Sequence, residues 1–139
     1  MAVEINITYE GGLHCAAIHG PSKQTLTTDA PVDNGGKGAA FSPTDLVATA
    51  LGACMTTIMG LVAQRNNLNI DGLQVQVLKE MTADPVRRIG SLKTRLVFPR
   101  GKLLSAADRA KFEAAAKACP VKQSLHPDLK TPMEFVYPD

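Results

Sequence analysis

Stretches in which apolar and polar residues alternate occupy the first part of the chain. Because successive side chains of a strand point to opposite faces, this alternation predicts strands at residues 3–9, 13–18 and 24–28. A Gly-Gly pair supplies the turn between the first two strands. Residues 30–40 are rich in glycine and also contain proline and asparagine, so we expect a loop there.

A long uncharged run predicts a helix from about Pro43 to Asn66. Ser42 is the expected N-cap residue, and Asp45 completes a capping box with it. The run is apolar on every side and has about the length of a membrane span, but its threonines and glycines and its lack of flanking aromatic residues favour a buried helix. One small domain has too little material to bury such a helix, so we expect a homodimer and no membrane partner.

The second half of the chain predicts a β-hairpin, a helix and a last strand. Alternation indicates strands at residues 73–81 and 89–98, and the second should place one set of side chains on one face: Leu92, Thr94, Leu96 and Phe98. A helix should run from a Ser105 cap to Lys117, a short helical turn should begin at Pro120, and a strand should follow at residues 133–137. This order predicts a single α+β domain over residues 1–139.

Composition narrows the classes of function. The 15 basic and 13 acidic residues are scattered, no basic stripe exists and there is no tryptophan, so we expect no nucleic-acid partner. Three cysteines, an odd number, and the lack of a signal-like segment favour the reducing cytoplasm over a disulfide-stapled secreted protein. No nucleotide, flavin or metal motif is present, so we predict no bound cofactor.

Two cysteines are the best candidates for chemistry. Cys54 shares the most apolar stripe of the long helix, formed by Val47, Ala50, Leu51, Cys54, Ile58 and Leu61. Cys119 opens a helix as Cys-Pro, where the helix N-terminus favours a thiolate, so we expect Cys119 to ionise more readily than Cys54. Taken alone, Cys54 also fits a plain core residue and Cys119 a plain cap residue. If the fold joins them, one can attack an oxidant and the other can resolve the product as a disulfide.

The third cysteine has a weaker case. Cys15 follows His14, and His19 lies nearby, but chelate spacing and a fourth ligand are missing, so we expect no metal site. Ser124 and His126 lack a placed acid, so a hydrolase triad is not indicated either.

Two motifs carry a family resemblance. Ser-Pro-Thr-Asp-Leu-Val-Ala-Thr-Ala-Leu-Gly-Ala-Cys at 42–54 and Cys-Pro-Val-Lys-Gln-Ser-Leu at 119–125 resemble the signature of the OsmC/Ohr family of osmotically inducible and organic hydroperoxide resistance proteins. The resemblance implies an intertwined α+β homodimer, with long central helices, antiparallel sheets and two interfacial active sites. It also implies thiol-dependent reduction of organic hydroperoxides, with Cys54 as the peroxidatic and Cys119 as the resolving cysteine, and a dithiol or lipoylated protein as the reductant.

The chain departs from this family at two places. Thr44 stands where the peroxidases carry a glutamate, and residues 1–42 contain no arginine to stabilise the reactive thiolate. The alternative interpretation is therefore an OsmC-like dimer without peroxidase activity, which binds a small apolar ligand at the subunit interface.

Overall fold

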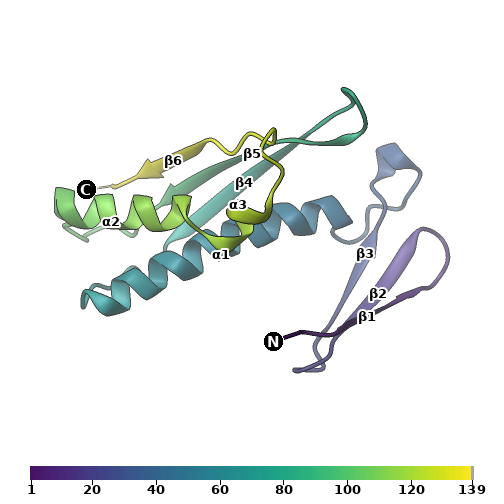
Figure 1. The fold of residues 1–139 in the computed structure, drawn as a ribbon, viewed down its shortest axis with the longest axis horizontal. Helices are drawn as coiled ribbons and strands as arrows, with labels where there is room; N and C mark the ends of the chain where they lie inside the picture. Colours follow the sequence, from purple (N-terminus) through teal and green to yellow (C-terminus); the bar gives the residue numbers. More distant parts are fainter. Residues whose placement is uncertain (139) are drawn as a thin grey trace. The chain divides into compact units, whose positions relative to one another are not determined.

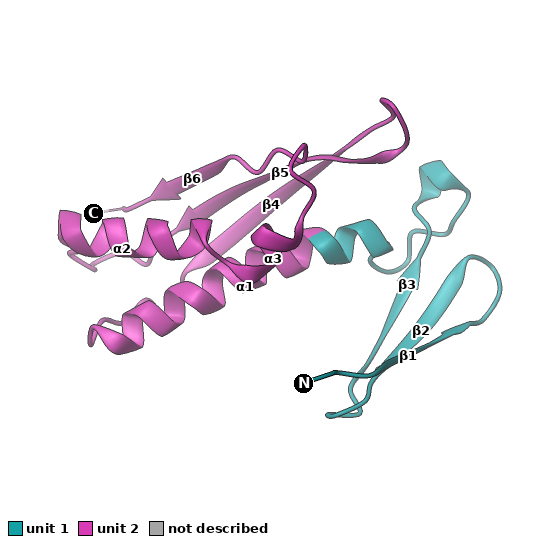
Figure 2. Ribbon diagram, in the orientation of Figure 1, with its two compact units in different colours: residues 1–47 teal, residues 48–139 magenta. Residues whose placement is uncertain are grey.

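The computed structural model describes residues 1–138 and contains two three-stranded sheets and three α-helices (Figure 1). This is the α+β class that the sequence predicts. The chain forms two compact units, residues 1–47 and the residues from Ala48 onward (Figure 2). The prediction of one domain over residues 1–139 and that of an intertwined homodimer stay predictions.

The first unit is built on an antiparallel sheet of order β1-β2-β3. Its strands are β1 (Ile5–Tyr9), β2 (His14–His19) and β3 (Thr25–Asp29), close to the predicted ranges. The β1–β2 turn needs positive φ angles at Gly11 and Gly12, which glycine adopts without a steric penalty. The loop between β3 and the first α-helix includes a short 3-10 helix, Val32–Asn34.

One face of this sheet is apolar and exposed in the chain. The register pairs Ile7 with Ala17 and Tyr9 with Cys15, so these side chains share a face. We call this face the apolar sheet face; its apolar members are Ile5, Ile7, Tyr9, Cys15, Ala17 and Leu26, and the polar His19 and Thr28 lie on the same face. Ile7 keeps 66% of its surface exposed and Tyr9 63%, so the first unit has no hydrophobic core on this side.

Helix α1 (Pro43–Arg65) begins with the predicted capping box. The Ser42 Oγ accepts a hydrogen bond from the Asp45 N–H at 3.1 Å, and the Asp45 carboxylate accepts one from the Ser42 N–H at 3.0 Å. Two of the N–H groups that a helix start leaves without helical partners are thereby satisfied, which is why the helix begins at this position.

The second unit holds a mixed sheet and two further helices. Strands β4 (Gln74–Thr82) and β5 (Arg88–Val97) form the predicted antiparallel hairpin, and β6 (Met133–Val136) pairs with β5 in parallel. Helix α2 (Ala106–Lys117) is capped by Ser105, as predicted, and α3 (Pro120–Ser124) follows. The predicted inner set of side chains is buried, including Phe98 directly after β5, whose ring centroid lies 5.5 Å from that of Phe112 in α2.

Helix α1 packs on the same face of this sheet as α2. A Cβ at Gly52 would approach the Val77 side chain to 2.9 Å, so glycine permits the close contact between α1 and β4. The buried residues of α1 are Ala48, Leu51, Gly52, Met55, Met59 and Ala63. Of the stripe predicted around Cys54 only Leu51 is buried, while Ala50 and Leu61 are exposed. The most apolar stripe is therefore not the buried face, because a helix that is apolar all round does not reveal from composition which face meets the sheet.

By length and composition α1 could also cross a membrane. Its most apolar window has a mean hydropathy of 1.9, and 33% of that window is buried in the chain. Core helices of soluble proteins have the same properties, and α1 packs against β4 as such a helix does. The absence of a membrane partner stays a prediction.

Candidate active site

Cys54 lies on the α1 segment of the second unit, at the margin of the buried helix face. Its side chain is half-buried, and the thiol is not part of a disulfide. The neighbouring turns place Leu51 in the core and leave Ile58 half-buried, so Cys54 is bordered by apolar side chains on its own helix. A partly accessible thiol in such a place can be reached by a small reagent.

Cys119 joins α2 to α3 and is fully buried. It is the N-cap residue of α3, and its Sγ accepts a hydrogen bond from the Lys122 N–H at 3.4 Å. Pro120 follows as the first helical residue, where a missing N–H costs nothing. The predicted helix start is therefore confirmed.

The fold brings these two thiols together. After burial, the neighbouring Cys54 also raises the pKa of the Cys119 thiol, so the two side chains lie near one another although 64 residues separate them in the chain (119 − 54 − 1). Neither of the two cysteines forms a disulfide. Two adjacent thiols can form a disulfide once one of them has been oxidised.

The electrostatics of Cys119 differ from the sequence-based expectation. Burial raises the pKa of the Cys119 thiol, and the neighbouring Cys54 raises the pKa further. The backbone N–H groups of Lys122 and Val121 act in the opposite direction but do not outweigh burial. Burial thus opposes the ease of ionisation that the helix start was expected to give Cys119, because position at a helix start does not reveal how deeply a side chain is buried.

A buried carboxylate in the first unit had no signal in the sequence pattern. Asp29 is 4% exposed, contacts the His14 imidazole, and accepts a hydrogen bond from the Ala39 N–H at 2.9 Å. The hydrogen bond to His14, opposed in part by desolvation, lowers the pKa of Asp29, and Lys37 adds a smaller effect in the same direction. Its neighbour in the chain, Ala30, donates its N–H to the Leu13 carbonyl, so these contacts fix the loop after β3 to the sheet.

Cys15 lies in the first unit on the apolar sheet face, paired in register with Tyr9 and Thr28. It is half-buried and forms no disulfide. Across residues 1–138 no three His, Cys, Asp or Glu side chains gather as metal ligands would. His14 and Cys15 point to opposite faces of β2, as expected for neighbours in a strand.

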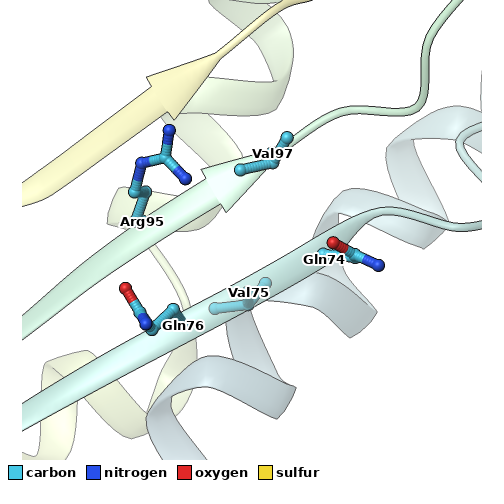
Figure 3. Close-up of a pocket in the computed structure, with 5 residues that line it drawn as sticks. All are labelled: Gln74, Val75, Gln76, Arg95 and Val97. Atoms are coloured by element: carbon cyan, nitrogen blue, oxygen red, sulfur yellow. The ribbon is translucent and has the colours of Figure 1, made fainter.

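A separate hollow lies on the β4–β5 hairpin. It has a volume of about 470 Å³ and is lined by Gln74, Val75, Gln76, Arg95 and Val97 (Figure 3). The glutamines and Arg95 belong to the sheet face opposite the one that packs on α1. This hollow contains neither cysteine, so it is not the site of thiol chemistry.

Comparison with known proteins agrees with this fold. The sequence profile of the family described as OsmC-like protein matches residues 35–134. A crystal structure from Psychrobacter arcticus 273-4, of a protein named for osmotic stress induction and detoxification response, is 42% identical; the match covers 94% of this chain and 93% of that one, with a TM-score of 0.88. No curated protein matches significantly.

Two more distant structures share the fold. The organic hydroperoxide resistance protein OsmC of Legionella pneumophila is 16% identical, with 98% of this chain and 97% of that chain covered and a TM-score of 0.77. The organic hydroperoxide resistance protein OhrB of Bacillus subtilis is also 16% identical, with 97% and 98% covered and a TM-score of 0.69. At 16% sequence identity, the similarity of these two structures to this chain shows a shared fold only.

Proposed function

Because the chain belongs to the OsmC family, whose members include organic hydroperoxide resistance proteins, we propose that it is a thiol-dependent peroxidase that reduces organic hydroperoxides. Cys54 is the attacking cysteine in this proposal and Cys119 is the resolving cysteine. The observation that carries the proposal is the pairing of a partly accessible thiol with a buried one. The names of the related structures support the same substrate class.

The proposed cycle has three steps. The Cys54 thiolate attacks the outer oxygen of the peroxide, so the O–O bond breaks and Cys54 becomes a sulfenic acid. The alkoxide that leaves takes up a proton from water, equal to the one that the Cys54 thiol released on ionising, and departs as the alcohol. The Cys119 thiol then attacks the Cys54 sulfur, which forms the disulfide and releases water. A dithiol reductant, such as a dihydrolipoyl group, exchanges with this disulfide, restores both thiols and leaves as its own disulfide.

The apolar surroundings of Cys54 support an alkyl hydroperoxide over hydrogen peroxide. Ile58 lies one turn beyond Cys54 on α1 and is not fully buried. An alkyl group bound beside it removes apolar surface from water, at about 25 cal/mol per Å². Hydrogen peroxide has no apolar group and gains nothing from this contact.

We also propose that the protein acts as a cytoplasmic homodimer. The apolar sheet face and the exposed side of α1, which includes Leu61 at 41% exposure, are not covered within the chain. A second copy offers matching apolar surfaces, and burial of such surfaces is the main favourable term in association.

The test is peroxide consumption with tert-butyl hydroperoxide as substrate and dihydrolipoamide or dithiothreitol as reductant. Cys54→Ser should abolish turnover, whereas Cys15→Ser should retain it and serves as the matched control. Cys119→Ser should consume one equivalent of peroxide and then stop, with Cys54 open to overoxidation to the sulfinic acid. Full turnover in Cys54→Ser would rule out the mechanism.

The second candidate is a dimer that binds a small apolar ligand without peroxidase chemistry. Thr44 at the position of the family glutamate favours it, together with the lack of arginine in residues 1–42. This candidate predicts that Cys54 reacts with alkylating agents no faster than an ordinary thiol, whose pKa is about 8.5. A Cys54 thiol that ionises well below this value favours the peroxidase.

A further inference from the structure

His14 lies between two carboxylates at one end of the first sheet. Its Nδ1 forms a hydrogen bond with the Asp29 carboxylate at 2.5 Å, and its Nε2 lies 3.5 Å from the Glu10 carboxylate. Glu10 follows β1, His14 opens β2 and Asp29 ends β3, so one imidazole joins the ends of three strands. The Asp29 side chain is 5% exposed, whereas that of Glu10 is 51% exposed. The proposed peroxidase chemistry uses none of these groups.

Asp29 also connects this end of the sheet to the loop that leads into α1. Its carboxylate accepts a hydrogen bond from the Ala39 N–H at 2.9 Å, and its backbone N–H donates to the Phe41 carbonyl at 3.2 Å. Phe41 directly precedes Ser42, whose Oγ caps the first turn of α1. The contact between His14 and Asp29 therefore fixes the segment through which the chain enters this helix.

We propose that Glu10, His14 and Asp29 form a pH-sensitive clamp: the imidazolium form of His14 holds both carboxylates, and loss of its proton frees Glu10 and loosens the loop that leads into α1. The clamp does not depend on the proposed peroxidase function, because it lies within residues 1–47 and contains neither Cys54 nor Cys119.

The protonation state of the imidazole decides how many carboxylates it can hold. In the imidazolium form both ring nitrogens carry a proton, so Nδ1 can donate to Asp29 while Nε2 pairs with Glu10. In the neutral form with the proton on Nδ1, Nε2 is an acceptor that faces a carboxylate oxygen, and two acceptors do not attract. The bond to Asp29 also loses the charge on its donor, which makes it weaker. A buried carboxylate with less compensation favours opening of the loop, where water can solvate it.

The charges around the clamp set the pH range in which it acts. The hydrogen bond with His14, opposed in part by desolvation, lowers the pKa of Asp29, and the Ala39 N–H and Lys37 act in the same direction, so this carboxylate is ionised at neutral pH. Histidine side chains ordinarily change charge near pH ~6.5. The contribution of the imidazolium pairs is therefore present below that pH and is lost as the pH rises through the neutral range. The next residue of β2, Cys15, points to the opposite face together with Tyr9.

The test is hydrogen exchange of the Ala39 amide, followed by NMR from about pH 5.5 to about pH 8 and expressed as protection relative to the intrinsic exchange rate at each pH. We expect the protection in the unmodified protein to fall about fivefold over this range. His14→Gln keeps a side chain that can donate to Asp29 but removes the titrating group, so its protection should not change with pH. His19→Gln, at the other end of β2, is the matched control and should keep the full fall.

A second variant tests the exposed partner without touching the histidine. Glu10→Gln keeps the shape of the side chain and removes its charge, so the fall in protection should shrink to about twofold. Protection that does not change with pH in the unmodified protein overturns the proposal, and so does an unchanged fall in His14→Gln or in Glu10→Gln. A loss of the fall in His19→Gln also overturns it, because the effect then belongs to that histidine. None of these measurements involves peroxide, so their outcome is independent of the proposed function.

Discussion

The two compact units of the chain bury different kinds of side chain. The unit from Ala48 onward has a core of fully buried apolar residues, among them Leu51, Met55, Met59, Leu92, Leu96 and Phe112. In the first unit the buried positions are polar, Asp29 and Ser42, while Ile7 and Tyr9 are largely exposed. The unit with the apolar core also contains both proposed active-site thiols.

The two units therefore differ in what stabilises them: apolar burial in the second unit and polar contacts in the first. Burial of apolar surface can hold the second unit together by itself, because a buried Leu or Phe contributes about 1.5–3 kcal/mol. In the first unit the buried Asp29 instead makes hydrogen bonds with the His14 side chain and the Ala39 N–H. We therefore expect the apolar sheet face of the first unit to gain its burial from the proposed second subunit.

The largest effect should come from the core of the second unit. Leu96→Ala removes a fully buried side chain from β5 and should lower the free energy of unfolding by about 3 kcal/mol. The measurement is urea denaturation followed by circular dichroism at several protein concentrations. Leu103→Ala, at a side chain that is 98% exposed, is the control and should change stability by less than about 0.5 kcal/mol. Equal effects would contradict the assignment of the core.

A charge on the apolar sheet face should act on assembly rather than on the second unit. Ile7→Asp places a carboxylate where we expect the partner subunit, and its desolvation should weaken the dimer by about 2 kcal/mol or more. Sedimentation equilibrium should show monomers at concentrations where the unmodified protein is dimeric. Thr8→Asp, on the opposite face of the same strand, should leave the dimer intact. Dissociation of both variants, or of neither, would refute this interface.

The first unit should be the more sensitive of the two to acid. The folded pKa of Asp29 lies below its ordinary value of 3.8, so its contribution to stability is present above about that pH and is lost as the pH falls through the folded pKa. Hydrogen exchange of the Ala39 amide, which is bonded to Asp29, should therefore accelerate first under acid conditions. Asp29→Asn should remove this pH dependence while the β5 amides keep theirs. An unchanged acid response in Asp29→Asn would show that another group is responsible.

The smallest expected difference concerns two helix caps. Ser42 is buried and belongs to a two-way capping box, whereas Ser105 is exposed and makes a single cap bond to the Asp108 N–H. Ser42→Ala should cost about 1.5 kcal/mol and Ser105→Ala about 0.7 kcal/mol, within the range for lost caps. Chemical denaturation of the two variants in parallel gives the comparison, and a larger loss at Ser105 would contradict it.

Features set by neighbours in the chain could be predicted from the sequence. The Ser42 and Ser105 caps, the ends of α1 and the β4–β5 hairpin depend on residues within a few positions of one another, and the predictions for them are confirmed. The parallel pairing of β6 with β5 and the contact of His14 with Asp29 join distant positions, and no local pattern encodes them.

The candidate site likewise depends on contacts between distant positions, which the sequence does not reveal. The sequence motifs identified Cys54 and Cys119 as the chemically interesting residues, but their nearness depends on the fold and no local pattern encodes it. The higher pKa of Cys119 could not be predicted, because it depends on how deeply that junction is buried.

The central claim is that Cys54 and Cys119 act as one redox pair. The most direct measurement is peptide mapping under non-reducing conditions after a stoichiometric pulse of tert-butyl hydroperoxide. The account predicts an intramolecular disulfide between Cys54 and Cys119, with Cys15 recovered as a thiol. A disulfide that contains Cys15 or links two chains, or recovery of Cys54 as an unmodified thiol, would contradict it.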